Sequence, residues 1–192
     1  MNSRLNIVLF AFAFNGLLSF YSYAQSPQKP YKNAQFTERI LESANAWNTA
    51  KNNKDYYTQA KYTYRKLISS HGNVEKWISD HQKAVVRIEE KNAAGGFSTS
   101  KRNLIFDQTG KMYHAGEEIY CVVPFSDVLK VRDRNYISYC SLVAISADKG
   151  ETWTFAEVTF MKDEHLDKFF PSFDKNVIRH KPKQGRYEEV PE

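Results

Sequence analysis

The chain has 192 residues, and its 27 lysine and arginine residues against 22 aspartate and glutamate residues give a formal net charge of +5. This length suits a single domain that buries its own core without a disulfide scaffold or a structural metal. The charge is too small and too evenly spread to indicate nucleic-acid binding, although it can favour an anionic envelope polymer or an acidic partner protein.

Residues 1–24 have the pattern of a secretory signal. Arg4 gives a positive charge, an apolar run follows from Leu5 to Phe20, and small residues at Ser22 and Ala24 suit a signal peptidase. The alternative is an uncleaved membrane anchor, but about 16 apolar residues are fewer than the ~20 that span a bilayer, and a polar Asn-Gly pair interrupts them. We therefore expect cleavage after Ala24 and a periplasmic or secreted chain without a membrane span.

The mature chain is expected to contain one folded domain. Residues 25–32 are polar with two prolines and predict a flexible lead-in. Residues 33–173 carry the periodic patterns of a domain, and residues 174–192 are charged and predict a mobile tail. No internal repeat is visible in the sequence.

Helical periodicity fills the first half of this domain. The first helix is expected to begin after Asn33, a residue suited to capping, and its apolar residues share one face. A polar run at residues 52–55 interrupts the pattern, and a second helix then continues to His71-Gly72, where glycine suits a left-handed cap. A third helix is expected to begin after Asn73, which can cap it, and to end at the alanine- and glycine-rich run at residues 93–96.

The pattern changes after about residue 97, where two-residue periodicity replaces helical spacing. It predicts five strands, at residues 103–106, 111–114, 118–128, 135–145 and 152–160. A short helix is expected from Asp163 to Phe170, ending at Pro171. Helices followed by an antiparallel meander predict an α+β fold, with the N-terminal helices packed on one face of a curved sheet.

The chain has two cysteines, Cys121 and Cys140. In an oxidising compartment two cysteines pair by default. A hairpin centred on the polar run at residues 130–134 would set them almost opposite each other, where Cβ atoms come within disulfide reach. A zinc site is the weaker alternative, because two thiolates without a CxxC spacing or nearby paired histidines make half a ligand set. We therefore expect a structural disulfide.

The run from Ile145 to Phe155 holds the most distinctive motif. Its pattern Ser146-x-Asp148-x-Gly150-x-Thr152-Trp153 resembles the Asp-box of sialidases and other bacterial-neuraminidase-repeat proteins. In that family the Asp carboxylate accepts backbone hydrogen bonds, the Gly adopts a conformation open to few other residues, and the Trp packs beneath the hairpin. The resemblance therefore implies a structural turn. A glycosidase is only a remote alternative, because one copy without repeats cannot build a propeller.

A tyrosine-rich basic segment is a candidate binding surface. Its side chains could stack on a glycan or a peptide while its cations hold an anionic group. The residues proposed for this surface are Tyr56, Tyr62, Lys61 and Arg65. The alternative is an ordinary amphipathic helix with Tyr57 and Tyr64 toward the core and the basic residues in solvent, and helical spacing favours this alternative.

The order of the expected elements across residues 33–160, ending in the hairpin described above, is similar to the cone-shaped α+β domains of the nuclear-transport-factor-like superfamily. This resemblance implies a cavity between the helices and the sheet. The lining residues that it implies are Trp47, Tyr64, Trp77 and His81. The fold hosts both enzymes and inert binders, so it implies no activity by itself.

The sequence contains no GxSxG, P-loop, GxGxxG or HExxH motif, and we expect neither a cofactor nor a metal. The expected function is that of an exported, non-catalytic domain that binds a protein, a peptide or an envelope glycan, a class that includes inhibitors and immunity-type proteins. Whether the protein is an enzyme stays open. The alternative is a small-ligand-binding or lyase/isomerase-type cone domain with His81 or a buried carboxylate as base. The sequence does not indicate an oligomeric state.

Overall fold

The computed structural model describes residues 30–94, 103–106, 108–131, 134–171, 173–174, 177 and 186–189. The signal predicted for residues 1–24, most of the lead-in and most of the tail lie outside these residues and stay predictions. None of the helices within the described ranges has the length and apolar character needed to cross a bilayer.

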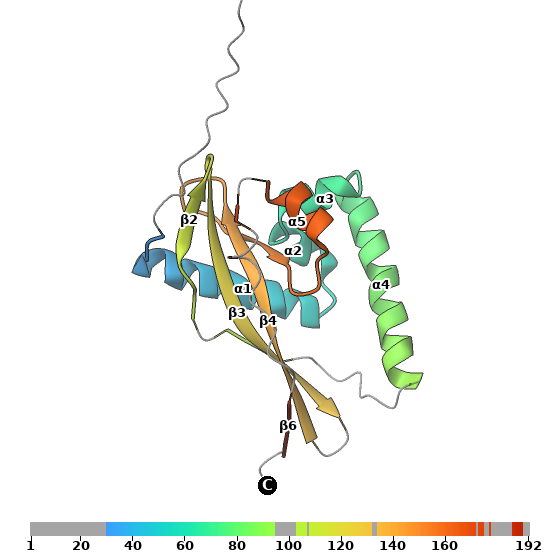
Figure 1. Ribbon diagram of the computed structural model, residues 1–192. Helices are drawn as coiled ribbons and strands as arrows, with labels where there is room; N and C mark the ends of the chain where they lie inside the picture. The colour runs from blue at the N-terminus through green and yellow to red at the C-terminus, as the bar shows by residue number, and fades with distance from the viewer. Residues whose placement is uncertain are drawn as a thin grey trace, which may run out of the picture.

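In the described part of the chain, four helices precede the sheet and one follows it (Figure 1). They are α1 (Ala34–Asn52), α2 (Tyr56–Lys61), α3 (Arg65–Ser70), α4 (Val74–Ala94) and α5 (Asp163–Phe169). The two expected caps are confirmed: Asn33 Oδ1 accepts a hydrogen bond from the Phe36 N–H at 3.2 Å, and Asn73 Oδ1 accepts one from the Lys76 N–H at 2.8 Å. Each cap gives a partner to an N–H group that has none within its helix.

The expected second helix is divided into α2 and α3, which corrects the prediction of one continuous segment. Thr63, between the two helices, forms a parallel bridge with Phe155. The Phe155 N–H donates to the Tyr62 carbonyl at 2.7 Å, and the Tyr64 N–H donates to the Phe155 carbonyl at 2.9 Å. A backbone that makes these bonds to a strand cannot also continue the helical ladder. The helix therefore breaks where the chain meets the sheet.

Six antiparallel strands form one sheet in the described residues. They are β1 (Asn103–Ile105), β2 (Met112–Ala115), β3 (Glu118–Val131), β4 (Arg134–Ser146), β5 (Thr154–Glu157) and β6 (Arg186–Glu189). β3 and β4 are the long central pair; β1 and β2 both pair with β3, and β5 and β6 both pair with β4. The predicted α+β class is confirmed. Residues 186–189, which we expected in the mobile tail, form β6 instead.

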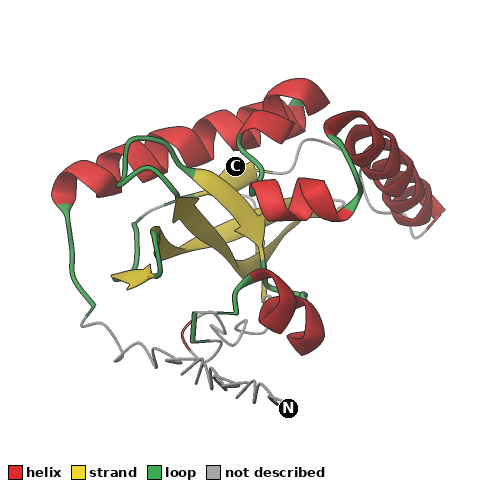
Figure 2. Ribbon diagram, turned by 90° about the horizontal axis from the view of Figure 1, so that it is seen from above, coloured by secondary structure: helices red, strands yellow, loops and turns green. Residues whose placement is uncertain are grey.

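Both faces of the sheet are covered, and Figure 2 shows the sheet between α1 on one side and α5 on the other. Successive side chains of a strand point to opposite faces. On one face, Ile40 and Trp47 of α1 pack with Phe155 and with the odd-numbered residues of β3 from Ile119 to Phe125. On the other face, Tyr64 and α5 pack with Tyr120 and Val122 of β3. This two-sided burial explains why β3 and β4 are apolar on both faces.

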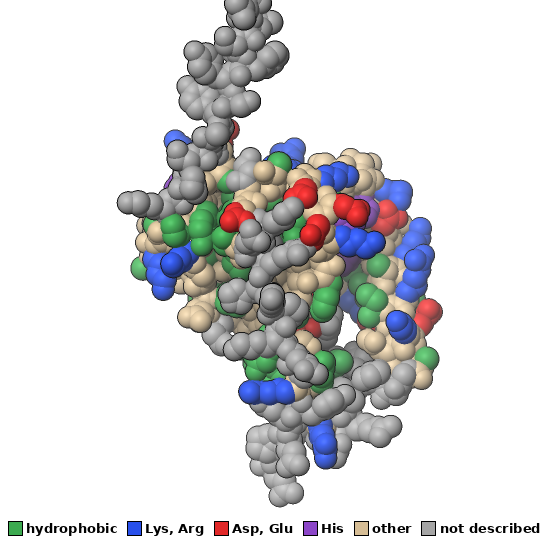
Figure 3. Space-filling model, viewed as in Figure 1, with side chains coloured by type: hydrophobic (Ala, Val, Ile, Leu, Met, Phe, Trp, Pro, Cys, Tyr) green, Lys and Arg blue, Asp and Glu red, His purple; other side chains and the backbone are tan. Residues whose placement is uncertain are grey.

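Helix α4 stands beside the sheet and contacts mainly α2 and α3 (Figure 1). Trp77 and Ile78 in its first two turns pack in a small third core with residues of α2 and α3. Farther along the helix, Val86 and Ile88 are exposed. On the face seen in Figure 3, basic and acidic side chains are mixed along α4. This face of the helix therefore carries no large patch of one charge.

The prediction of a disulfide between Cys121 and Cys140 is wrong. The β3–β4 register, fixed by the pair Val131 and Arg134, places Cys121 opposite Ala144 and Cys140 opposite Phe125. The two cysteines are thus displaced along the hairpin by about four residues, or ~13 Å, which is beyond disulfide reach. Both are buried on the α1 side of the sheet, and no disulfide joins them.

We predict that both cysteines react with a thiol reagent only after unfolding. Burial raises the pKa of the Cys121 thiol to about 12, which suppresses the reactive thiolate. Protein purified without reductant should show two reactive thiols in denaturant, one for each cysteine of the chain, and almost none in native buffer. Prior reduction should not change the count. A count of zero in denaturant, rising only after reduction, would show that a disulfide forms.

Candidate functional site

The motif between β4 and β5 forms a turn that its own side chains close. Ser146 Oγ accepts a hydrogen bond from the Gly150 N–H at 2.8 Å and donates one to Asp148 Oδ1 at 2.7 Å. The Asp148 carboxylate also accepts from the N–H of Thr152 at 2.9 Å and from its hydroxyl at 2.5 Å. Gly150 has a φ of 94°, in the left-handed region that favours glycine. These bonds fix the direction in which the chain returns to β5.

The turn is fixed against α1. Trp153 is buried and meets the Phe36 ring edge to face, with 5.8 Å between the ring centroids. A Cβ atom at Gly150 would clash with the Phe36 ring, so a larger residue there requires this ring to shift. Arg39 donates from Nη1 to the Gly150 carbonyl at 3.1 Å and pairs with the Glu151 carboxylate at 3.2 Å. The backbone of the turn therefore lies at a fixed distance from the helix.

Tyr62 borders the same region from the end of α2. Its backbone carbonyl accepts the hydrogen bond from Phe155 of β5 described above, and its ring is partly buried against the core on the α1 side. The edge of the sheet therefore sets the position of Tyr62, in the same way that α1 sets the position of the turn.

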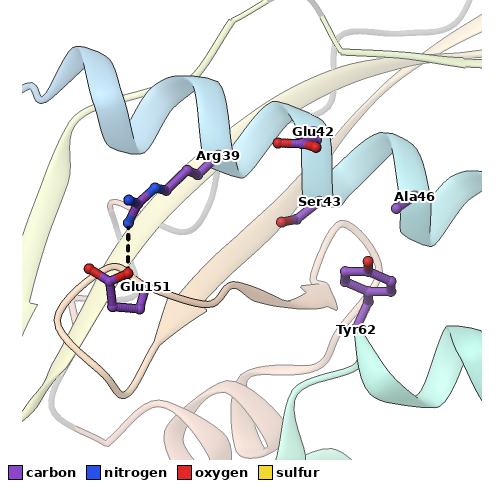
Figure 4. Close-up of a pocket in the computed structure, with 6 residues that line it drawn as sticks. All are labelled: Arg39, Glu42, Ser43, Ala46, Tyr62 and Glu151. Carbon is purple, nitrogen blue, oxygen red and sulfur yellow. Dashed lines mark ion pairs between the residues drawn. The ribbon is translucent and has the colours of Figure 1, made fainter.

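A groove of about 440 Å³ lies between α1, the turn and Tyr62 (Figure 4). Its lining residues are Arg39, Glu42, Ser43, Ala46, Tyr62 and Glu151. The first four occupy positions i, i+3, i+4 and i+7, which places them on one face of α1. In Figure 4 the Arg39–Glu151 ion pair lies at one end of the groove and Tyr62 at the other, with Ser43 between them. The groove thus joins residues from three distant parts of the chain.

The lining of the groove is acidic and rich in hydrogen-bond acceptors. Glu42 is exposed, and the Glu151 side chain is 70% exposed. Arg39 is the one cation among the lining residues, and its Nη1 already contacts the turn. The side chains of Glu42, Ser43 and Tyr62 make no hydrogen bond to any residue that the structure describes. A ligand that brings several donors would find acceptors here that the protein does not itself use.

A second polar cluster lies on the opposite face of the sheet. The Glu118 carboxylate accepts hydrogen bonds from the Tyr64 hydroxyl at 3.2 Å, from the Tyr120 hydroxyl and from the Lys66 ammonium group at 3.1 Å. Burial raises the pKa of both phenols. Tyr64 also stacks on Phe170, with 5.6 Å between the centroids. These four polar groups bond one another, which fits a structural role.

The four residues predicted to line a pocket do not share one cavity. Trp47 packs with Phe155 on the α1 side of the sheet, and Tyr64 lies on the other side. Trp77 and His81 stack on each other at 4.8 Å in the third core, beside α2. The prediction is corrected because the sheet itself separates Trp47 from Tyr64.

His81 is a packing residue between α2 and α4. Its ring lies against Trp77 and meets the Tyr56 ring at 5.8 Å. Burial lowers the pKa of His81 below its ordinary value of 6.5, and the positive charge of Lys51 lowers it further. Its Nε2 is buried without a partner among the described residues. His81 does not line the groove, so the groove gives no support to a lyase or isomerase that uses His81 as base.

Of the residues proposed for a binding surface, Tyr62 lines the groove and the others do not. Tyr56 is partly buried against His81. Lys61 and Arg65 are exposed on either side of the break between α2 and α3. A binding surface formed by all four residues stays a prediction.

The groove has to be interpreted from its own geometry. Comparison of the chain with protein families, with curated proteins and with solved structures gives no match. Across the described ranges, no three His, Cys, Asp or Glu side chains are grouped closely enough to hold a metal ion.

We predict that replacing Asp148 by alanine lowers the free energy of unfolding by about 1–2 kcal/mol, because the Thr152 N–H and hydroxyl lose their acceptor. Burial acts to raise the pKa of Asp148, but the hydrogen bonds from Thr152 and Ser146 outweigh it and hold the pKa below 3.8. The carboxylate therefore stabilises the fold above about pH 4, and this effect is lost as the pH falls through the folded-state pKa.

Urea unfolding at neutral and at strongly acidic pH measures this effect. The difference between wild type and Asp148→Ala should shrink in acid, and an equal difference at both pH values would contradict the role of the charged form. Asp148→Asn keeps one acceptor oxygen and should retain part of the stability at neutral pH.

We predict that Glu118→Ala costs about 2–3 kcal/mol of unfolding free energy, because two buried phenol hydroxyls lose their acceptor. Glu118→Gln, which keeps an acceptor oxygen, should cost less. The matched control is Glu117→Ala, because Glu117 is exposed and lies in the turn just before β3. Equal losses for Glu117→Ala and Glu118→Ala in thermal and urea unfolding would show that the cluster is not stabilising.

Proposed function

We propose that the protein is an exported, non-catalytic binding domain and that its ligand occupies the groove between α1 and the β4–β5 turn. The proposed ligand classes are a protein, a peptide or an envelope glycan, and inhibitors and immunity-type proteins belong to this kind of domain. Export is supported by the pattern of residues 1–24 in the sequence. Binding is supported by the groove.

One observation carries the proposal: the groove combines fixed walls with polar groups that the protein does not use. Trp153 and Gly150 hold the turn against α1, and the backbone bond to Phe155 holds Tyr62. Between these walls, the side chains of Glu42 and Ser43 have no protein partner in the described part of the chain. Ligand sites are typically preformed in this way, with a few polar groups that fix orientation.

The exposure of the groove favours recognition over reaction. Glu42 and Glu151 both face solvent, and Glu151 is paired with Arg39. Catalytic acids and bases are commonly shifted by burial, which removes part of their hydration. The lining also contains no histidine that could activate the Ser43 hydroxyl. These features support a site that holds its ligand without changing it.

The test is a screen of the purified full chain on peptide arrays and glycan arrays, which cover the proposed ligand classes. Ser43→Arg places a long side chain in the groove, and Glu38→Arg places the same side chain on an exposed position of α1 outside the groove. We expect signals that Ser43→Arg abolishes and Glu38→Arg preserves. Signals that survive Ser43→Arg, or no signal on either array, would remove the groove as the binding site.

The same experiment tests the absence of catalysis. Ligands identified on the arrays are incubated with the protein and recovered, and mass spectrometry should show them unchanged. Cleavage or rearrangement that Ser43→Arg prevents would instead assign an enzyme activity to the groove.

A further inference from the structure

We propose that the ligand of the groove is a neutral oligosaccharide, with one sugar ring stacked on Tyr62 and neighbouring hydroxyl groups donated to the carboxylates of Glu42 and Glu151. This inference rests on the proposed binding function and names the class of ligand. Its support comes from the charge of the lining, the charge of the whole chain and the small apolar content of the groove. A further support is that backbone groups at the nearby sheet edge are already hydrogen-bonded.

The charge of the lining disfavours acidic ligands. Glu42 and Glu151 contribute two negative charges, and Arg39 contributes the single positive one. The guanidinium Nη1 of Arg39 is engaged by the Glu151 carboxylate and by a carbonyl of the turn. A phosphate, a sulfate or an acidic sugar would therefore meet two carboxylates and no unengaged cation in the lining, which is an unfavourable interaction.

The charge of the whole chain disfavours a strongly basic partner. The chain carries a formal net charge of +5, opposite in sign to the groove. A polybasic peptide would be attracted by two carboxylates and repelled by the rest of the molecule. An uncharged ligand meets neither penalty, so the two charge arguments together favour a neutral molecule.

The composition of the groove disfavours a peptide. The apolar lining consists of Ala46 and the Tyr62 ring, whereas an amphipathic peptide helix needs a hydrophobic groove for several anchors. An extended peptide would need a sheet edge for its backbone. At the nearby edge, Phe155 already exchanges backbone hydrogen bonds with the segment around Thr63. Both usual ways of holding a peptide therefore lack support here.

A sugar ring matches the groups that remain. The C–H face of a pyranose ring packs on an aromatic ring, and its ring hydroxyls are donors that can pair with both oxygens of one carboxylate. The groove supplies an aromatic ring in Tyr62, a carboxylate in Glu42 and a hydroxyl in Ser43. Its volume of about 440 Å³ lies within the roughly 300–1,000 Å³ that small-ligand sites occupy.

The experiment is calorimetric titration of the purified full chain with defined oligosaccharides. The neutral probes are hexamers of β-1,4-glucose, α-1,4-glucose, β-1,4-mannose and β-1,4-N-acetylglucosamine. The charged probes are oligogalacturonate, a glucosamine hexamer and an oligolysine peptide. We expect at least one neutral hexamer to bind, with an affinity that does not change between low and high salt because no charge pairing is involved.

Matched variants locate the binding. Glu42→Gln should weaken binding about tenfold, as expected for hydrogen bonds to a charged acceptor. Tyr62→Ala should weaken it at least as much through the lost stacking surface. The controls are Glu38→Gln, one turn earlier on α1, and Tyr57→Ala, which changes a tyrosine of α2 that is 66% exposed and outside the groove. Both controls should bind as wild type does.

Tyr62 also packs on the core, so Tyr62→Ala is interpreted only if its melting temperature stays near that of wild type. If the melting temperature of Tyr62→Ala falls, Glu42→Gln, at an exposed helix position, decides whether the groove binds the sugar. Failure of every neutral hexamer, or equal binding by Glu42→Gln and Glu38→Gln, would overturn the inference. Groove-dependent binding of acidic glycans or peptides alone would also overturn it, while the proposed function would stand. Array signals that survive Ser43→Arg, or the absence of any array signal, would overturn the proposed function instead.

Discussion

The pairing of β3 with β4 is the constraint on which the other elements depend. The two strands pair without interruption from Ile119 and Ser146 to Val131 and Arg134. This register decides which side chains face α1 and which face α5, and a shift by one residue would exchange the two sets. It also decides where β4 ends, and therefore where the turn to β5 meets α1. The groove beside that turn is a consequence of the same register.

At this meeting point Gly150 lies against the Phe36 ring, with no space for a Cβ atom between them. Because glycine has no Cβ atom, the turn can approach α1 closely enough for Arg39 to reach both the Gly150 carbonyl and the Glu151 carboxylate. The motif and the groove are thus linked physically: Asp148 and Ser146 shape the turn, and the turn supplies one wall of the groove. The same motif residues that fix the chain reversal therefore also fix the position of Glu151.

Local signals predicted much of the fold, and non-local contacts explain what was missed. The caps at Asn33 and Asn73 and the α+β class follow from short-range chemistry, and the structure confirms them. The break at Thr63 depends on the edge of β5, which the sequence places about 90 residues away, so helical periodicity could not reveal it. The disulfide prediction failed because the alternation of apolar and polar residues does not fix the hairpin register, and a small shift in this register separates Cys121 from Cys140. From the sequence alone, Arg39, Glu42 and Ser43 have the pattern of the solvated face of an amphipathic helix. Only the position of the turn beside α1 makes them part of a groove.

Two clusters in this protein combine carboxylates, tyrosine and a basic residue, and burial assigns them different roles. Around Glu118 the hydrogen bonds are made within the protein, and the two phenols are buried, so removing one partner costs stability. Around Glu42 the carboxylate faces solvent and has no protein partner in the described residues. Only polar groups that the fold leaves exposed and unengaged can exchange water for a ligand at little cost to stability. The composition of the two clusters is similar, and the unsatisfied hydrogen-bonding capacity of the groove is the feature on which we base the proposal that it binds a ligand.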